Sequence, residues 1–275
     1  AIDMRPDDDP GHLDFVAISA HKMYAPYGTG ALIGPTSIFA RGAPDMVGGG
    51  TVDIVTVDDV RWAGPPDRDE AGSPNVVGAV ALAQTILSLQ EIGMETLARH
   101  EAELTAHALS RLQAIDGAEL YGLADPERAH ERVGVIPFNV RGSDHYKVAA
   151  VLSFEGGIAV RNGCFCAHPY ILRLLKVSSE DALRHQQDIL DGTRVGLPGL
   201  VRISFGCYNT VKEVDHAADV LARIAAGDIQ GEYEQDSGSG EYWPRGYEPD
   251  YEDYFVLQPG RKAHPRERKL PRCGV

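Results

Sequence analysis

The chain has 275 residues, 43% hydrophobic and 24% charged, a composition typical of a globular protein with a full core. Its net charge of −14 argues against a nucleic-acid-binding groove, which needs a basic surface. No apolar run approaches the roughly 18 residues that cross a bilayer, and no signal peptide opens the chain, so we expect a cytoplasmic protein without membrane contact. Cys164, Cys166, Cys207 and Cys273 show neither zinc spacing nor a secreted disulfide pattern, so we expect reduced thiols and no metal site.

The first predicted element is an apolar strand over residues 14–18, which leads into Ser19, His21 and Lys22. Because Ser19 and His21 are two residues apart, a strand points both to the same side, where both can donate hydrogen bonds to a phosphate. Lys22 follows directly, and a lysine near a cationic or apolar site can condense with an aldehyde. The alternative is an ordinary solvated loop lysine. The pattern favours an anion site beside a reactive amine.

A Pro- and Gly-rich turn over residues 24–30 and a short strand over 30–34 come next. Three glycines at 48–50 predict a backbone that approaches another surface closely or takes positive φ, although they are also compatible with a simple turn. Ser73 is then a suitable N-cap, and Pro74 a suitable first residue, for an apolar helix over 76–92 that we expect to be buried.

The remainder alternates helices and strands, which suits a small α+β domain. A helix over 94–115 carries one apolar stripe and is expected to link this domain to the preceding one. His100 and His107 share a face of it without the further ligands that a metal needs. The predicted strands are 118–121, 132–140, 158–161 and 201–205, and the predicted helices are 144–154, 178–190 and 211–226.

Two later segments carry side chains with chemistry. Cys166 lies between the turn residues Gly163 and Pro169, with Arg161 and His168 close enough to favour a thiolate nucleophile on a mobile loop. Alternatively, Cys164 and Cys166 are small buried apolar residues or form a Cys-x-Cys redox pair. The role of Cys164 stays open. Arg202 sits inside the apolar strand 201–205, where an arginine is costly unless paired, which favours a functional role.

These segments resemble, in the same order, the class V aminotransferases, a group of pyridoxal 5'-phosphate (PLP) enzymes that includes the cysteine desulfurases. The stretch DFVAISAHKMYAPYGTGALIG resembles the cofactor-lysine segment. EAGSPN at 70–75 is similar to the family's Glu-x-Gly-Thr-Pro-Asn, and 157–169 to the desulfurase Gly-Ile-x-Val-Arg-x-Gly-x-x-Cys-Ala-x-Pro. Arg202 matches the strand arginine that precedes a Tyr-Asn-Thr turn. The resemblance covers roughly residues 11–226.

The resemblance implies an α/β protein of the aspartate-aminotransferase-like fold type I. Residues 1–93 would be the C-terminal part of the large PLP-binding domain, and 94–230 the linking helix and small C-terminal domain. In the family, an aromatic or imidazole ring stacks on the pyridine of PLP, and an aspartate pairs with the pyridine nitrogen. Both residues precede the lysine motif, so the chain resembles the C-terminal portion of a longer enzyme. Residues 231–275 form an acidic, aromatic and then basic tail that we expect to be partly disordered, with a flexible joint at 237–240. Docking of its aromatic residues onto the body is the alternative.

The resemblance also implies roles for individual residues. Lys22 would hold PLP, with Ser19 and His21 at its phosphate and Ser73 reaching the phosphate of a partner in a homodimer. Arg161 and Arg202 would bind the carboxylate of an amino-acid substrate.

Cys166 would take the sulfur of cysteine, leaving alanine and an enzyme persulfide for a possible sulfur-acceptor protein. The alternatives are another PLP-dependent lyase, epimerase or aminotransferase in which Cys166 is a bystander, or a non-catalytic fragment that lacks half of the cofactor site.

Overall fold

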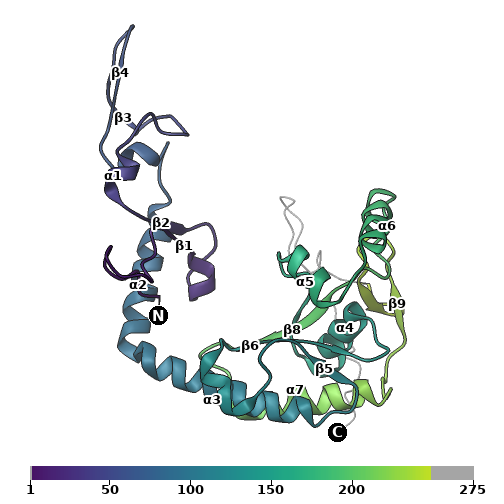
Figure 1. The fold of residues 1–275 in the computed structure, drawn as a ribbon. Helices are drawn as coiled ribbons and strands as arrows, with labels where there is room; N and C mark the ends of the chain where they lie inside the picture. Colours follow the sequence, from purple (N-terminus) through teal and green to yellow (C-terminus); the bar gives the residue numbers. More distant parts are fainter. Residues whose placement is uncertain (1, 249–275) are drawn as a thin grey trace, which may run out of the picture. The chain divides into compact units, whose positions relative to one another are not determined.

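A computed structural model describes residues 2–248 of the chain. The chain divides into two compact units, with the boundary after Leu97, a little beyond the predicted limit at residue 93. Figure 1 shows the elements of each unit, which are described here one unit at a time.

The first unit is built from two antiparallel hairpins and one long helix (Figure 1). Strands β1 (Val16–Ser19) and β2 (Gly30–Ile33) pair, as do β3 (Val52–Val55) and β4 (Val60–Trp62). In chain order, the short helix η1 (Ala20–Met23) connects β1 to β2, and α1 (Thr36–Phe39) lies between β2 and β3. The short helix η2 (Asp67–Asp69) follows β4 and precedes the long helix α2 (Val76–Ile92). A small core of Ala20, Ala25 and Leu82, with Ile86 packed against it, joins the lysine segment to α2.

Helix α2 differs from its prediction in burial and in its cap. We expected a buried helix, but only Gly78 and Leu82 are buried, and Val77 is 83% exposed. The cap is Asn75 and not Ser73, since the Asn75 side chain accepts a hydrogen bond from the Gly78 N–H at 2.9 Å. The same side chain donates to the Thr29 hydroxyl, so a contact with a distant turn selects Asn75 as the cap.

The second unit is a four-stranded antiparallel sheet with helices packed on it (Figure 1). The strand order is β5 (Ala118–Leu120), β6 (Val135–Val140), β8 (Leu200–Ser204) and β7 (Arg161–Gly163). Alternate residues of β6 are buried, and its buried face joins a single core with apolar residues of α3 (Met94–Gln113), α4 (His145–Gly156) and α7 (Val211–Ala225). The short helices η3 (Pro126–Glu131), α5 (His168–Leu174) and α6 (Ser179–Leu190) complete the unit.

The predicted strand 158–161 lies three residues too early. Gly157 adopts a left-handed conformation at the end of α4, and the Ile158 N–H donates to the Leu152 carbonyl at 2.9 Å. The backbone of Ile158 therefore serves the helix C-cap, as in a Schellman-type ending. Pairing with β8 starts only at Arg161, which lies opposite Arg202.

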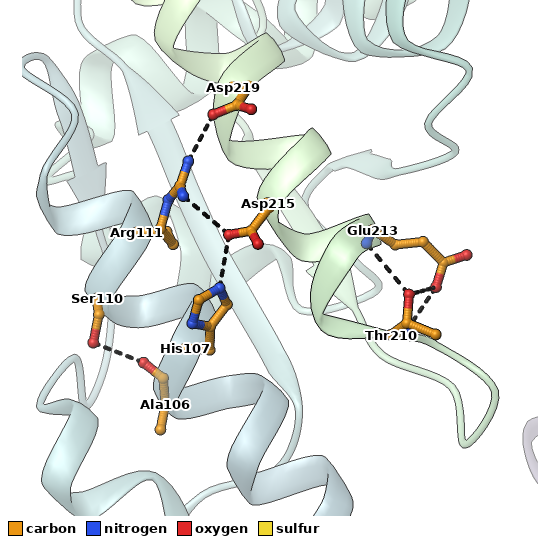
Figure 2. A network of polar contacts seen from close by, with 8 residues as sticks. All are labelled: Ala106, His107, Ser110, Arg111, Thr210, Glu213, Asp215 and Asp219. Carbon is orange, nitrogen blue, oxygen red and sulfur yellow. Dashed lines mark hydrogen bonds and ion pairs between the residues drawn. The ribbon is translucent and has the colours of Figure 1, made fainter.

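Helices α3 and α7 are joined by a polar network that includes one of the two histidines noted in the sequence (Figure 2). His107 donates through Nε2 to the Asp215 carboxylate at 2.7 Å, and Arg111 reaches both Asp215 and Asp219, at 3.0 and 2.6 Å. Thr210 and Glu213 form a capping box at the start of α7. His107 is thus part of a link between helices. Within residues 2–248, no cluster of His, Cys, Asp and Glu could hold a metal ion.

The predicted flexible joint at 237–240 is wrong, because these residues form the turn of a hairpin between β9 (Tyr233–Gln235) and β10 (Tyr242–Pro244). The aromatic residues of this hairpin dock onto α4, where the Phe154 ring lies 6.1 Å from the Trp243 ring and 5.2 Å from that of Tyr247. Docking onto the body was the alternative that the sequence left open. The prediction of disorder for 249–275 lies outside the described residues.

Glu155, at the end of α4, holds the start of this hairpin segment. Its carboxylate is only 10% exposed and accepts hydrogen bonds from Arg223 and from the Gln230 and Gly231 N–H groups at 2.8–3.1 Å. The Tyr233 hydroxyl donates to it at 3.2 Å, and burial, together with this carboxylate, raises the pKa of Tyr233. One carboxylate therefore satisfies four donors from three parts of the chain.

Replacement of Glu155 by alanine is expected to destabilise the second unit by about 2–4 kcal/mol, because the Arg223 charge and two N–H groups lose their partner. Asp228→Ala is the matched control, since Asp228 contacts the same arginine at 4.0 Å but is 66% exposed. It should cost no more than about 1 kcal/mol. Urea unfolding followed by circular dichroism measures both changes, and equal midpoints for the two variants would contradict the assignment.

Candidate active site

Lys22 lies on η1 directly after β1, and its side chain is exposed. The strand ends at Ser19, so the prediction that Ser19 and His21 share one face of a strand is wrong. The chain leaves the strand because Ala20 and Ala25 are buried against α2, with the Ala25 N–H donating to the Ala20 carbonyl at 3.1 Å. Tyr24, in a left-handed conformation with φ of 68°, closes this turn. Burial of Ala20 leaves His21 and Lys22 on the outside.

The orientation of His21 is set by a residue that the sequence analysis did not single out. The Tyr27 ring stacks on the imidazole with 4.7 Å between ring centroids and 18° between planes. Tyr27 comes from the Pro- and Gly-rich turn that follows the lysine. A tyrosine in a glycine turn five residues after the lysine was the available signal.

The Glu70–Asn75 segment adjoins the lysine segment within the first unit. Asn75 donates to the Gly28 carbonyl and the Thr29 hydroxyl at 3.1 and 2.9 Å. A Cβ at Gly78 would lie 1.8 Å from that hydroxyl, so only glycine allows this approach. Ser73 precedes Asn75 by two residues and is exposed, with its hydroxyl free of any role as a helix cap.

Of the three glycines at 48–50, only Gly50 takes the predicted positive φ, and a Cβ would meet nothing within 4 Å at Gly49 and only ordinary contacts at Gly48. Gly50 has a φ of 91°, which favours glycine. The Gly72 N–H donates to the Gly49 carbonyl at 2.9 Å, so this loop supports the backbone next to Ser73.

Cys166 and Arg161 are brought together in the second unit. The Arg161 guanidinium lies 3.5 Å from the Cys166 sulfur, and both side chains are exposed. Phe165 and Cys166 both have positive φ, 52° and 60°, an uncommon conformation for residues with a Cβ that is found at strained functional turns. Pro169 does not end a loop as predicted but occupies the first turn of α5, where its missing N–H is tolerated.

Arg202 completes this group from the neighbouring strand, since it pairs with Arg161 in the β7–β8 register. Its guanidinium carbon lies 5.0 Å above the Phe165 ring, and its Nε is buried without a hydrogen-bond partner. Burial, and then repulsion from Arg161, lowers the pKa of Arg202, which still carries its charge at neutral pH. Among residues 2–248, neither arginine forms an ion pair with a carboxylate. Two adjacent unpaired guanidiniums beside a thiol define an anion site with a nucleophile.

Cys164 and Cys166 are both free thiols that face different surroundings. Cys164 is half-buried and donates to the Pro198 carbonyl at 3.4 Å, and burial raises the pKa of its thiol. The two predicted groups of site residues belong to different units: Ser19, His21, Lys22 and Ser73 to the first, and Arg161, Cys166 and Arg202 to the second.

The first group fits PLP in the chemistry of its donors. An exposed primary amine suits the aldehyde, and two hydroxyls and an imidazole suit the phosphate. The second group supplies two guanidiniums, which suit a carboxylate, and a thiol, which can act as a nucleophile. No single helix of residues 2–248 is long and apolar enough to cross a membrane, and α2 and α3 reach that criterion only when taken together across the break at Gly93.

The fold is that of an α/β protein of the class of fold type I PLP-dependent transferases, which the chain matches over about half of the length of the solved structures. The chain belongs to the class V aminotransferase family, whose model, "Aminotransferase class-V", matches residues 4–216. This family is PLP-dependent. The family resemblance drawn from the sequence is confirmed.

Cysteine desulfurases are prominent among the similar proteins. The chain is 34% identical over 218 residues to a probable cysteine desulfurase of Staphylococcus aureus, covering 79% of this chain and 46% of that protein. The cysteine desulfurase CsdA of Escherichia coli has a similar structure, with a TM-score of 0.64 and 26% identity over 79% of this chain and 47% of that one. Cysteine desulfurase from Thermococcus onnurineus gives a TM-score of 0.63 at 32% identity, covering 78% of this chain and 48% of that one. The chain thus spans about half the length of the relatives it matches.

Proposed function

We propose that the protein containing this chain is a PLP-dependent cysteine desulfurase-like enzyme. It would convert cysteine to alanine and carry the released sulfur as a persulfide on Cys166. The observation that carries the proposal is the exposed Cys166 thiol 3.5 Å from the Arg161 guanidinium, with Arg202 in the adjoining strand position and, within residues 2–248, no ion pair between either arginine and a carboxylate.

The lysine segment would hold the cofactor. Bound PLP would supply an electron sink for charge that develops at the substrate. The Lys22 amine would bind the aldehyde and later move a proton at the substrate Cα. Ser19 and His21 would donate hydrogen bonds to the phosphate, and the stacked Tyr27 would keep the imidazole in place. We further propose a homodimer in which Ser73 reaches the phosphate held by the partner.

The arginines and the cysteine would handle the substrate. A guanidinium fork matches a carboxylate in shape and charge, so Arg202 and Arg161 would orient the substrate by its α-carboxylate. The Cys166 thiolate would then attack the substrate sulfur. A sulfur–sulfur bond forms, the Cβ–sulfur bond breaks with its electron pair left on carbon, and protonation of that carbon gives alanine. Arg161 would stabilise the negative charge on sulfur before attack, and a sulfur-acceptor protein would accept the sulfur from the exposed loop.

Product analysis of the whole protein tests this proposal. With cysteine and a reductant, we expect alanine and sulfide in equal amounts, and without reductant a Cys166 peptide heavier by one sulfur atom. Pyruvate with ammonia would instead identify a lyase, and a change in the chirality of an amino acid would identify an epimerase. A keto acid formed without sulfide would indicate an aminotransferase, and no turnover of any amino acid a non-catalytic role. Each of these outcomes would overturn the desulfurase proposal.

A further inference from the structure

A cavity of about 460 Å³ lies in the second unit, and neither Arg161 nor Cys166 is among the described residues that line it. It is lined by residues of α5, α6 and the loop at 194–198, together with Tyr146 of α4, Gly163 at the end of β7 and Cys164 after it. Its wall is mainly apolar, with Leu172, Ile189 and Leu197 contributing. A volume in this range, with an apolar wall and few polar groups, is typical of sites for small molecules.

The charged side chain that lines this cavity is a cation, Arg194. Arg194 is exposed at its rim and, among residues 2–248, its guanidinium has neither an ion pair nor a hydrogen bond. Further in, Nδ1 of His185 is buried without a hydrogen-bond partner, 3.6 Å from the Asp188 carboxylate. Of the residues that the structure describes, no Asp or Glu lines the cavity, although the chain as a whole carries a net charge of −14. An unpaired cation on an apolar cavity is complementary to an amphipathic anion.

We infer that this cavity binds a small apolar molecule that carries one carboxylate. The apolar part packs against Leu172, Ile189 and Leu197, and the carboxylate pairs with the Arg194 guanidinium at the rim. Cys164 is one of the lining residues, so a ligand in the cavity would shield its thiol. The site is distinct from the Cys166 thiol and independent of the proposed desulfurase reaction.

Alkylation of the two cysteines tests the inference, with octanoate as the probe and 1-octanol as its uncharged counterpart. N-ethylmaleimide is added to the whole protein, and fragment-ion mass spectrometry at low conversion measures alkylation of Cys164 and of Cys166 separately from that of the other two cysteines. At ten times its Kd, octanoate should slow alkylation of Cys164 about tenfold by mass action, while the exposed Cys166 is slowed less than about twofold. Octanol should protect Cys164 only at concentrations at least about tenfold higher, because it forms no charged pair with Arg194.

Two pairs of variants separate the charge from the cavity. Arg194→Gln should raise the octanoate concentration needed for protection by about tenfold or more, whereas Arg184→Gln, an exposed arginine of α6 outside the cavity, should not. Ile189→Trp should fill the cavity and remove protection, whereas Leu183→Trp on the exposed side of the same helix should keep it. The inference is overturned if octanoate and octanol protect Cys164 equally, or if octanoate protects it equally well in Arg194→Gln. It is also overturned if octanoate does not protect Cys164 at any concentration.

Discussion

Lys22→Ala is expected to abolish turnover of cysteine, with a loss of roughly four orders of magnitude or more, because no other group can replace a covalent amine. The Lys22 side chain is exposed, and its amine has no hydrogen bond or ion pair within residues 2–248, so folding stability should change by no more than about 0.5 kcal/mol. The activity loss is therefore chemical and not structural. The measurement is alanine formation, together with borohydride reduction and mass spectrometry. Reduction should fix the cofactor to the Lys22 peptide of the unmodified protein and leave none on the variant.

Lys212→Ala is the control for this experiment, since Lys212 is an exposed lysine on α7 outside both groups of site residues. It should keep full activity and full labelling of the Lys22 peptide. Cofactor fixed to another lysine in the unmodified protein would contradict the assignment of Lys22. So would a Lys22→Ala protein that retained a sizeable fraction of its activity.

Cys166→Ser is expected to lower sulfide and alanine formation by about three orders of magnitude, because a serine hydroxyl is a far weaker nucleophile toward sulfur than a thiolate. Serine has the same Cβ as cysteine, so the left-handed conformation at this position, with φ of 60°, is no more strained than before. Unlike Lys22→Ala, this variant should retain the cofactor on Lys22. The two variants therefore separate cofactor attachment from sulfur transfer.

Cys164→Ser serves as the matched control two residues away. A serine hydroxyl can donate to the Pro198 carbonyl as the Cys164 thiol does, so we expect activity within about threefold of the unmodified protein. If Cys166→Ser still releases sulfide, Cys166 does not take part in the reaction, and a PLP-dependent lyase is favoured over a desulfurase.

Much of the architecture follows from short-range signals in the sequence. The predicted helix over 144–154 is capped by Asp144, which accepts from the Tyr146 N–H, and ends at Gly157 in the left-handed conformation. The helix at 211–226 begins with a capping box of Thr210 and Glu213. These interactions join residues within four positions of one another, so the sequence alone contains them. The closeness of Arg161 to Cys166, five residues apart, has the same origin.

Only the tertiary structure decided how segments far apart in the chain modify these local patterns. The strand before Lys22 stops at Ser19 because Ala20 and Ala25 pack on Leu82, and Asn75 is the cap of α2 because its side chain reaches Thr29. The register of β7 against β8 sets Arg161 opposite Arg202, and Glu155 orders a segment expected to be flexible.

Local hydrogen bonds and caps are encoded within a few residues, so the sequence by itself determined the element types, the family and the candidate reactive residues. The end of a strand, the choice of a cap and the pairing of two arginines depend on contacts between residues that are tens of positions apart in the chain. Such contacts arise only when the core forms, and their energies exceed the local preferences they override.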